Sequence, residues 1–149
     1  MKDTIDAPDG IEWLGVSLKT ILAPESTGGA MSIVDTVAPI GFSPPRHIHH
    51  AEDEIFVILT GEMDVLINGE ITRAGPGDAA FVPRGAEHSF LVTGDRPCRH
   101  LTILTPGGFE RFFNEMAEGN CRIPQDMDVI VESAARHNTE FTGPPLGAD

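Results

Sequence analysis

Short apolar runs separated by turn residues fill the first hundred residues. Each run is rich in Val, Ile, Thr and Phe and has the length of a β-strand. The breakers between them include Thr60-Gly61-Glu62, Asn68-Gly69-Glu70 and Gly75-Pro76-Gly77, and Asn-Gly between apolar runs is a strong hairpin signal. The pattern predicts a stack of hairpins, with strands in residues 11–22, 31–37, 55–59, 63–67, 79–82, 89–92 and 101–104.

The pattern changes after Pro106, where apolar residues begin to recur at steps of three and four. This spacing is typical of amphipathic helices. The first predicted helix carries Phe109, Phe112, Phe113 and Met116 on one face. The second begins after Pro124, with Met127, Ile130, Val131 and Ala134 on one face, before the turn-rich end of the chain.

Strands followed by short helices favour an all-β barrel or sandwich with C-terminal helices. At 149 residues and 40% hydrophobic composition, the chain suits one domain with one core. We therefore expect a single domain over residues 1–149, with N-terminal strands in 1–30, the barrel core in 31–105 and a C-terminal helical extension in 106–149.

Charge and composition exclude several classes of partner and compartment. With 23 acidic and 10 basic residues, the net charge of −13 opposes binding to nucleic acid or anionic membranes. The sequence shows neither a secretory leader pattern nor an apolar run long enough to span a bilayer, so we expect a cytoplasmic protein. Cys98 and Cys121 form no metal or redox motif, and we expect free thiols.

Candidate chemistry is concentrated between Arg46 and Glu54, with a further histidine at His88. His47 and His49 are two residues apart, so in a strand their side chains project from the same face. The polar segment 50–53 can form a turn that resets the alternation and lets Glu54 face the same interior. The alternative is a solvated loop with acidic neighbours and a separate surface histidine at His88.

Three imidazoles and one carboxylate suit one divalent first-row transition metal, namely Fe, Ni, Co, Mn, Cu or Zn. Calcium and magnesium prefer more oxygen ligands. Four protein ligands leave a five- or six-coordinate ion open to substrate or dioxygen, whereas a closed structural zinc site more often includes cysteine.

The glycines and prolines around these residues resemble two motifs of the cupin superfamily. The first motif is matched at every defined position, by Gly41, His47, His49, Glu54 and Gly61. The second is matched by Gly77, Pro83, Gly85 and His88, while its final asparagine is replaced by Val92. That asparagine does not ligate metal in the family, so its loss bears on local packing or pocket polarity.

The resemblance implies a double-stranded β-helix, or jelly-roll, barrel in which His47, His49, Glu54 and His88 match the metal ligands of the family. It also implies a homodimer paired through its sheets. A weaker resemblance, in the segment Pro106–Phe113 and the closing residues 142–146, is to single-domain cupins grouped with quercetin 2,3-dioxygenases. The cupin fold hosts many reactions and therefore does not select one.

Strand alternation predicts an apolar pocket around the metal for a small-molecule substrate. Phe90 and Val92 share the parity of His88, while Phe56 and Ile58 share that of Glu54. Each of these four side chains can instead be plain core. Such walls suit a small aromatic or enolic, flavonol- or polyketide-like substrate better than a sugar.

The resemblance to quercetinases implies a metal-dependent dioxygenase in which Glu54 completes the metal shell or takes the enolic proton of the substrate. We expect apolar burial to raise the pKa of Glu54 into a range useful for proton transfer. Two alternatives remain open: an oxygen-independent, metal-assisted isomerase, cyclase or lyase, and a non-catalytic cupin that binds a small molecule.

The other histidines carry less weight. His100 shares strand parity with Thr102 and could line the barrel, but it is left out of the predicted ligands because a lone strand histidine is more often core. His50 and His137 are expected at the surface. The chain has no nucleophile elbow, phosphate loop or dinucleotide fingerprint, which argues against common serine hydrolase, nucleotide and nicotinamide functions.

Overall fold

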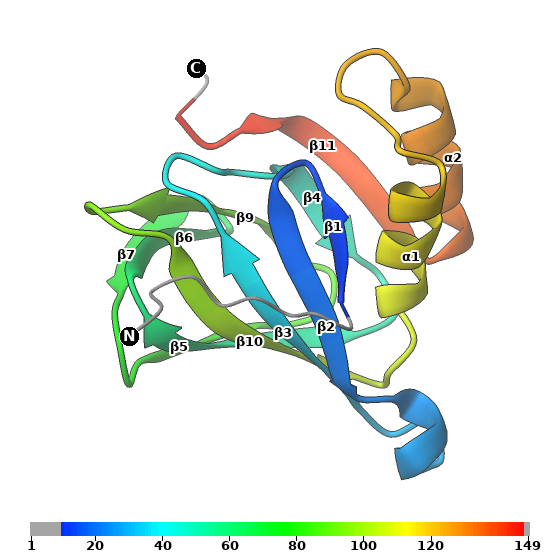
Figure 1. Ribbon diagram of the computed structural model, residues 1–149, viewed down its shortest axis with the longest axis horizontal. Coiled ribbons are helices and arrows are strands. Elements are labelled where there is room, and N and C mark those ends of the chain that lie inside the picture. The colour runs from blue at the N-terminus through cyan, green and yellow to red at the C-terminus, as the bar shows by residue number, and fades with distance from the viewer. Residues whose placement is uncertain (1–9, 148–149) are drawn as a thin grey trace.

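A computed structural model describes residues 10–147, which fold into two antiparallel β-sheets with two helices at one end (Figure 1). The six-stranded sheet has the order β1-β2-β3-β10-β5-β8, and the five-stranded sheet has the order β11-β4-β9-β6-β7. The strands are β1 (Ile11–Trp13), β2 (Val16–Leu22), β3 (Ser32–Ala38), β4 (Pro45–His49), β5 (Asp53–Thr60), β6 (Glu62–Ile67), β7 (Glu70–Ala74), β8 (Ala79–Val82), β9 (Glu87–Thr93), β10 (Cys98–Thr105) and β11 (Thr139–Pro145). This architecture confirms the predicted jelly-roll barrel with C-terminal helices.

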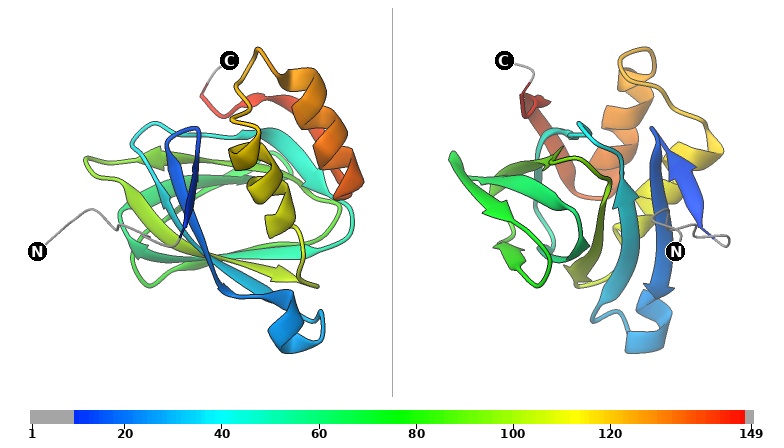
Figure 2. Two further views of the ribbon diagram at one scale, coloured as in Figure 1. Left: turned by 45° about the vertical axis from the view of Figure 1, so that its right-hand side comes forward. Right: turned by 60° about the vertical axis from the view of Figure 1, so that its left-hand side comes forward.

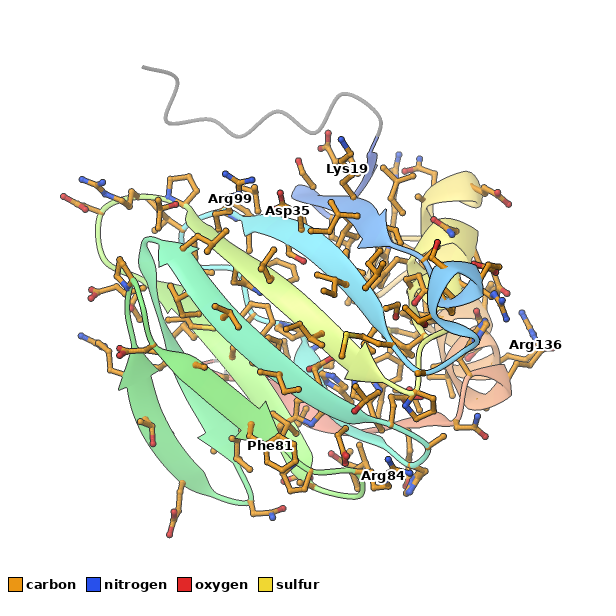
Figure 3. All side chains as sticks on the ribbon, turned by 90° about the horizontal axis from the view of Figure 1, so that it is seen from below. Lys19, Asp35, Phe81, Arg84, Arg99 and Arg136 are labelled. Carbon is orange, nitrogen blue, oxygen red and sulfur yellow. The ribbon has the colours of Figure 1, made fainter. Side chains whose placement is uncertain are left out.

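The central strands of the six-stranded sheet, β3, β10 and β5, bury every second side chain over most or all of their length. In β10, which lies between β3 and β5, burial alternates along the whole strand, so that Cys98, His100, Thr102 and Leu104 point inward. The outer face carries charge instead: Arg99 donates two hydrogen bonds to the Asp35 carboxylate, at 3.0 and 2.6 Å (Figure 3). The strict alternation gives one wall of the barrel a fixed set of inward positions.

In the five-stranded sheet, β6 and β7 form the hairpin that the Asn-Gly signal predicts. Asn68 and Gly69 both have positive φ values, 47° and 85°, as a type I′ turn requires. The short strand β4 lies between β11 and β9 and places residues 45–49 across the barrel from β5. Both predicted histidines of the first motif therefore sit in a paired strand.

The helices α1 (Glu110–Glu118) and α2 (Met127–Arg136) lie together at one end of the two sheets (Figure 2). Both are predicted by the apolar spacing. Their buried faces form a second apolar cluster that includes Phe112, Met116 and Ile130. Val131 is an exception, because 47% of it is exposed; the buried stripe of α2 is narrower than its sequence suggests.

The predicted strand over 11–22 is wrong in its continuity. Leu14 and Gly15 adopt positive φ values of 55° and 81° and turn the chain, so the run folds into the β1-β2 hairpin. Trp13 packs within the chain, where its indole N–H donates a 2.7 Å hydrogen bond to the Cys121 carbonyl and its ring meets Phe112 edge-on. The part of the expected N-terminal strands in residues 1–9 lies outside the described residues.

The C-terminal extension contains a strand as well as helices. β11 pairs with β4 and places Thr139 opposite His49. Its sequence includes Gly143, Pro144 and Pro145, which weaken the strand signal and are tolerated because β11 is an edge strand. The strand thus places residues 139–145 beside β4, the strand that carries His47 and His49 (Figure 1).

Neither helix in the described residues has the length and apolar content needed to cross a membrane. Cys98 and Cys121 are free and buried, as expected.

Candidate metal centre

Three histidine side chains converge inside the barrel near the helical end. His47 and His49 lie on β4, and His88 lies on β9 directly opposite His47. One ring nitrogen from each lies within 4.8 Å of the other two. His49 and His88 are almost fully buried, at 2% and 0% exposure. The cross-strand register therefore assembles the trio that the two motifs predict.

Each imidazole is oriented by a partner at its Nδ1 atom. The Nδ1 of His47 lies 2.7 Å from the Pro45 carbonyl, and that of His88 lies 3.0 Å from the Ala86 carbonyl. For both, Nδ1–H donates to the carbonyl; this leaves the Nε2 lone pair of His47 free, whereas Nε2 of His88 also contacts the Glu54 carboxylate at 3.2 Å. Such partners fix the ring orientation and tautomer of metal-ligating histidines.

His49 takes its orienting contacts from two different segments. Its Nδ1 lies 2.9 Å from the Thr139 hydroxyl of β11 and 3.2 Å from the carboxylate of Glu52. Sequence reasoning missed both residues. Thr139 is ninety positions away along the chain and has no distinguishing signal, whereas Glu52 stands in the acidic segment beside the histidines and is 6% exposed.

Glu54 joins the histidines from β5. Its two carboxylate oxygens lie 3.3 Å from His49 Nε2 and 3.2 Å from His88 Nε2, and the residue is 5% exposed. The turn between β4 and β5 thus resets the strand alternation as predicted. The structure brings all four predicted metal-site residues together.

Burial would by itself raise the pKa of Glu54, but the charge and hydrogen bond of His49, together with His88, hold that pKa well below its ordinary value. The expected upward shift is therefore wrong, because the carboxylate is paired rather than isolated among apolar groups. Burial lowers the pKa of His49, but Glu54 and Glu52 outweigh it and raise that pKa to about 9.

His47 behaves differently from His49. Burial, followed by the neighbouring His88 and His49, holds its pKa well below the ordinary value. It is therefore neutral at pH 7. A cluster with a neutral imidazole, a shared proton between His49 and Glu54, and inward Nε2 atoms fits a divalent transition metal, whose binding displaces that proton.

A cavity of about 290 Å³ adjoins the cluster. His47, His49 and Glu54 line it, together with a wall made mostly of apolar and aromatic side chains. The aromatic residues of the wall are Trp13, Phe42, Phe56, Phe90, Phe109, Phe112, Phe113 and Phe141. The volume is at the lower end of the range for ligand pockets, roughly 300–1,000 Å³.

Two of the four predicted pocket residues line this cavity. Phe56 and Phe90 face it, and their rings lie 5.6 Å apart. Ile58 and Val92 do not line it: they are 1% and 2% exposed and belong to the barrel core. Ile58 lies two residues beyond Phe56 on β5, and Val92 lies two residues beyond Phe90 on β9. Both therefore lie farther from the cavity, among the buried residues of the barrel core.

Two further cavity residues did not enter the predicted site. Phe109, which precedes α1, places its ring 4.4 Å from that of His49. His100, left out of the predicted ligands, is outside the three-histidine cluster but lines the cavity and is 1% exposed. His50 pairs with Glu140 at the surface, as expected, whereas His137 is partly buried against Glu115.

The fold is the double-stranded β-helix of cupins, and residues 33–104 match the family model described as a cupin domain. Among solved structures, a predicted oxalate decarboxylase from Thermotoga maritima has a TM-score of 0.60 and 26% identity, covering 69% of this chain and 98% of the other.

The curated proteins that this chain resembles are named for different activities. The chain is 28% identical over 100 residues to quercetin 2,3-dioxygenase of Bacillus subtilis, covering 67% of this chain and 29% of that protein. It is 31% identical over 94 residues to tetracenomycin polyketide synthase protein TcmJ of Streptomyces glaucescens, covering 62% of each. The chain thus spans less than two thirds of either relative.

Proposed function

We propose that this cupin is a metal-dependent dioxygenase that acts on a small aromatic or enolic, flavonol- or polyketide-like substrate. The observation that carries the proposal is the position of Glu54, whose carboxylate touches two inward imidazoles at the wall of an apolar cavity. Similarity to a quercetin 2,3-dioxygenase supports the choice of reaction.

His47, His49 and His88 would hold the metal through Nε2, with Glu54 as a fourth ligand or as the neighbouring base. A redox-active ion such as Fe, Ni, Co, Mn or Cu would supply the path for electrons from the deprotonated substrate to dioxygen. The Nδ1 partners keep the three rings from turning away, which preserves the inward set of donor atoms.

Glu54 is the proposed proton acceptor. Its low pKa keeps it ionised at neutral pH, so an oxygen of its carboxylate can accept the proton of an enolic or phenolic hydroxyl. A positioned general base contributes typically 10²- to 10⁴-fold to rate. Proton removal leaves the substrate oxygen negatively charged and ready to be oxidised.

The aromatic walls exclude water from this reaction. Phe109 covers one side of His49, and Phe56 and Phe90 meet edge to face farther inside. A dry pocket strengthens the electrostatic interactions within it and protects a reactive anion from unwanted protonation.

A second candidate is an oxygen-independent cyclase, isomerase or lyase. The closely paired Glu54 and His49 can move a proton without dioxygen, and the similarity to a tetracenomycin polyketide synthase protein favours chemistry on polyketides. A cupin that binds such molecules without turnover would use the same cavity.

The test is oxygen consumption by the full chain loaded with each candidate ion, measured with quercetin and other enolic aromatics. We expect uptake with a redox-active ion and a loss of about 10²- to 10⁴-fold in Glu54→Gln. Glu140→Gln is the matched control, because Glu140 is an exposed carboxylate paired with His50. Substrate conversion without oxygen uptake would replace the dioxygenase by the second candidate; binding without conversion would leave the non-catalytic one.

A further inference from the structure

A second polar group lies in the cavity, away from the three-histidine cluster. It consists of His100 and Thr102 on β10 and Thr36 on β3, all of which line the cavity. All three are at least nine-tenths buried, with exposures of 1%, 5% and 4%. None of these three residues belongs to the metal centre described above.

Hydrogen bonds join these side chains into one chain. The Thr36 hydroxyl reaches the Val34 carbonyl at 3.3 Å, the two threonine hydroxyls are 3.1 Å apart, and Thr102 Oγ1 is 3.3 Å from His100 Nδ1. All contacts are satisfied when His100 Nδ1–H donates to Thr102, Thr102 donates to Thr36, and Thr36 donates to Val34. His100 Nε2 then carries a lone pair and accepts hydrogen bonds.

That Nε2 atom is buried without a hydrogen-bond partner in the protein. Burial lowers the pKa of His100 to about 4, against the smaller opposing influence of Glu54 and Asp35, so the imidazole is neutral at pH 7. Leaving a buried polar atom unpaired costs about 1–3 kcal/mol. Because His100 lines the cavity, a hydroxyl group of a cavity occupant can supply the partner that this acceptor lacks.

The acceptor is separated from the metal centre by aromatic rings. The rings of Phe56 and Phe90 lie 5.4 and 5.5 Å from that of His100. Glu54 pairs with Leu104 on β10, and His100 lies four residues from Leu104, or about 13 Å along the strand. A flat molecule between the two polar groups would contact these rings along its length.

We propose that His100 Nε2 accepts a hydrogen bond from a hydroxyl group of the substrate, at the end remote from the metal centre. The substrate class is then an aromatic molecule with a distal hydroxyl, and the residue discriminates it from analogues that lack one. This inference rests on the proposed function only in placing the substrate in the cavity; it requires neither dioxygen nor turnover.

The test compares 2-naphthol with naphthalene, which differ by one hydroxyl, as ligands of the zinc-loaded full chain. Zinc has no redox chemistry, so binding is measured without oxidation. We expect 2-naphthol to bind between about twofold and about tenfold more tightly than naphthalene, since a neutral hydrogen bond contributes on this scale. His100→Phe should abolish the difference and leave naphthalene binding, while His100→Gln, which keeps an acceptor, should retain part of it.

A spectroscopic measurement on the wild type covers the case in which a variant fails to fold. In ¹⁵N NMR, the His100 ring should show the Nδ1–H tautomer, and its Nε2 signal should shift on addition of 2-naphthol but not naphthalene. Equal affinities for the two ligands, a difference that survives in His100→Phe, or an Nε2 signal that 2-naphthol leaves unmoved would each overturn the inference. Failure of zinc to bind would instead count against the metal centre, and the same comparison on the metal-free chain would still decide the role of His100.

Discussion

At the scale of single residues, the two ring nitrogens of each histidine have different roles: one is held by a hydrogen-bond partner and the other is directed toward a ligand. At the metal centre, Nδ1 is held by a carbonyl, a hydroxyl or a carboxylate, and Nε2 faces the cluster. His100 follows the same principle, with Nδ1 held by Thr102 and Nε2 left for a ligand. The protein thus uses local hydrogen bonds to direct four ring nitrogens inward.

The proton shared by His49 and Glu54 leads to a pH-dependent prediction. With a pKa of about 9, His49 is protonated at pH 7 in the metal-free protein and must lose its proton to ligate a metal. Metal binding should therefore release protons at pH 7, and apparent affinity should rise as pH increases toward 9. Titration calorimetry in buffers of different ionisation enthalpy measures this release.

The raised pKa of His49 also affects the stability of the metal-free protein. This pKa is raised from 6.5 to about 9 in the folded state, so the contribution of His49 is complete below pH 6.5 and disappears as pH rises through 9. Binding heats that do not depend on the buffer at pH 7 would contradict the assignment of the shared proton to His49.

At the scale of elements, spacing predicted most of the strands and both helices, because regular alternation and apolar periodicity leave a direct trace in the sequence. The apolar runs did not include β4 or β7, although the Asn-Gly signal indicated the hairpin that β7 completes; the first four residues of β7 are exposed. They also did not include β11, whose prolines and glycine are typical of a turn. For the same reason, the predicted site did not include Thr139 or His100. Thr139 lies on β11, and a lone histidine such as His100 looks like ordinary core until its partners are visible.

The turn between β5 and β6 gives a prediction about backbone geometry. Gly61 has φ of +78°, and a Cβ there would lie 2.5 Å from the Pro97 carbonyl oxygen and 2.8 Å from Cys98 Cα. Gly69 has φ of +85° with no atom within 4 Å, so it serves as the matched control.

Alanine at Gly69 should cost about 1–2 kcal/mol, for the left-handed conformation alone. At Gly61, alanine should cost about 3 kcal/mol or more, because the backbone must also move apart. Chemical denaturation of the two variants measures the difference. Equal losses would show that the close approach to Pro97 does not constrain the fold.

At the scale of the whole molecule, two sheets and two helices surround the cavity beside the metal centre, and two different polar groups line it. The β4-β9 register and β5 form the metal centre, β3 and β10 form the second polar group, and aromatic residues lie between them. The comparisons establish the cupin fold and a match of residues 33–104 to the cupin domain model, whereas the reaction cannot be predicted from a fold that hosts many. The homodimer stays a prediction.

The central claim, a metal centre at His47, His49, His88 and Glu54, is tested most directly by metal content. The full chain, His49→Ala and His50→Ala would each be equilibrated without oxygen with Fe(II), Co, Ni, Mn, Cu and Zn in turn, freed of unbound ion and analysed by mass spectrometry. We expect near-stoichiometric metal in the wild type and in His50→Ala, because the His50 side chain is exposed and pairs with Glu140, and we expect a large loss in His49→Ala. A wild type that stays empty with every ion, or a His49→Ala variant that retains its metal, would contradict the account.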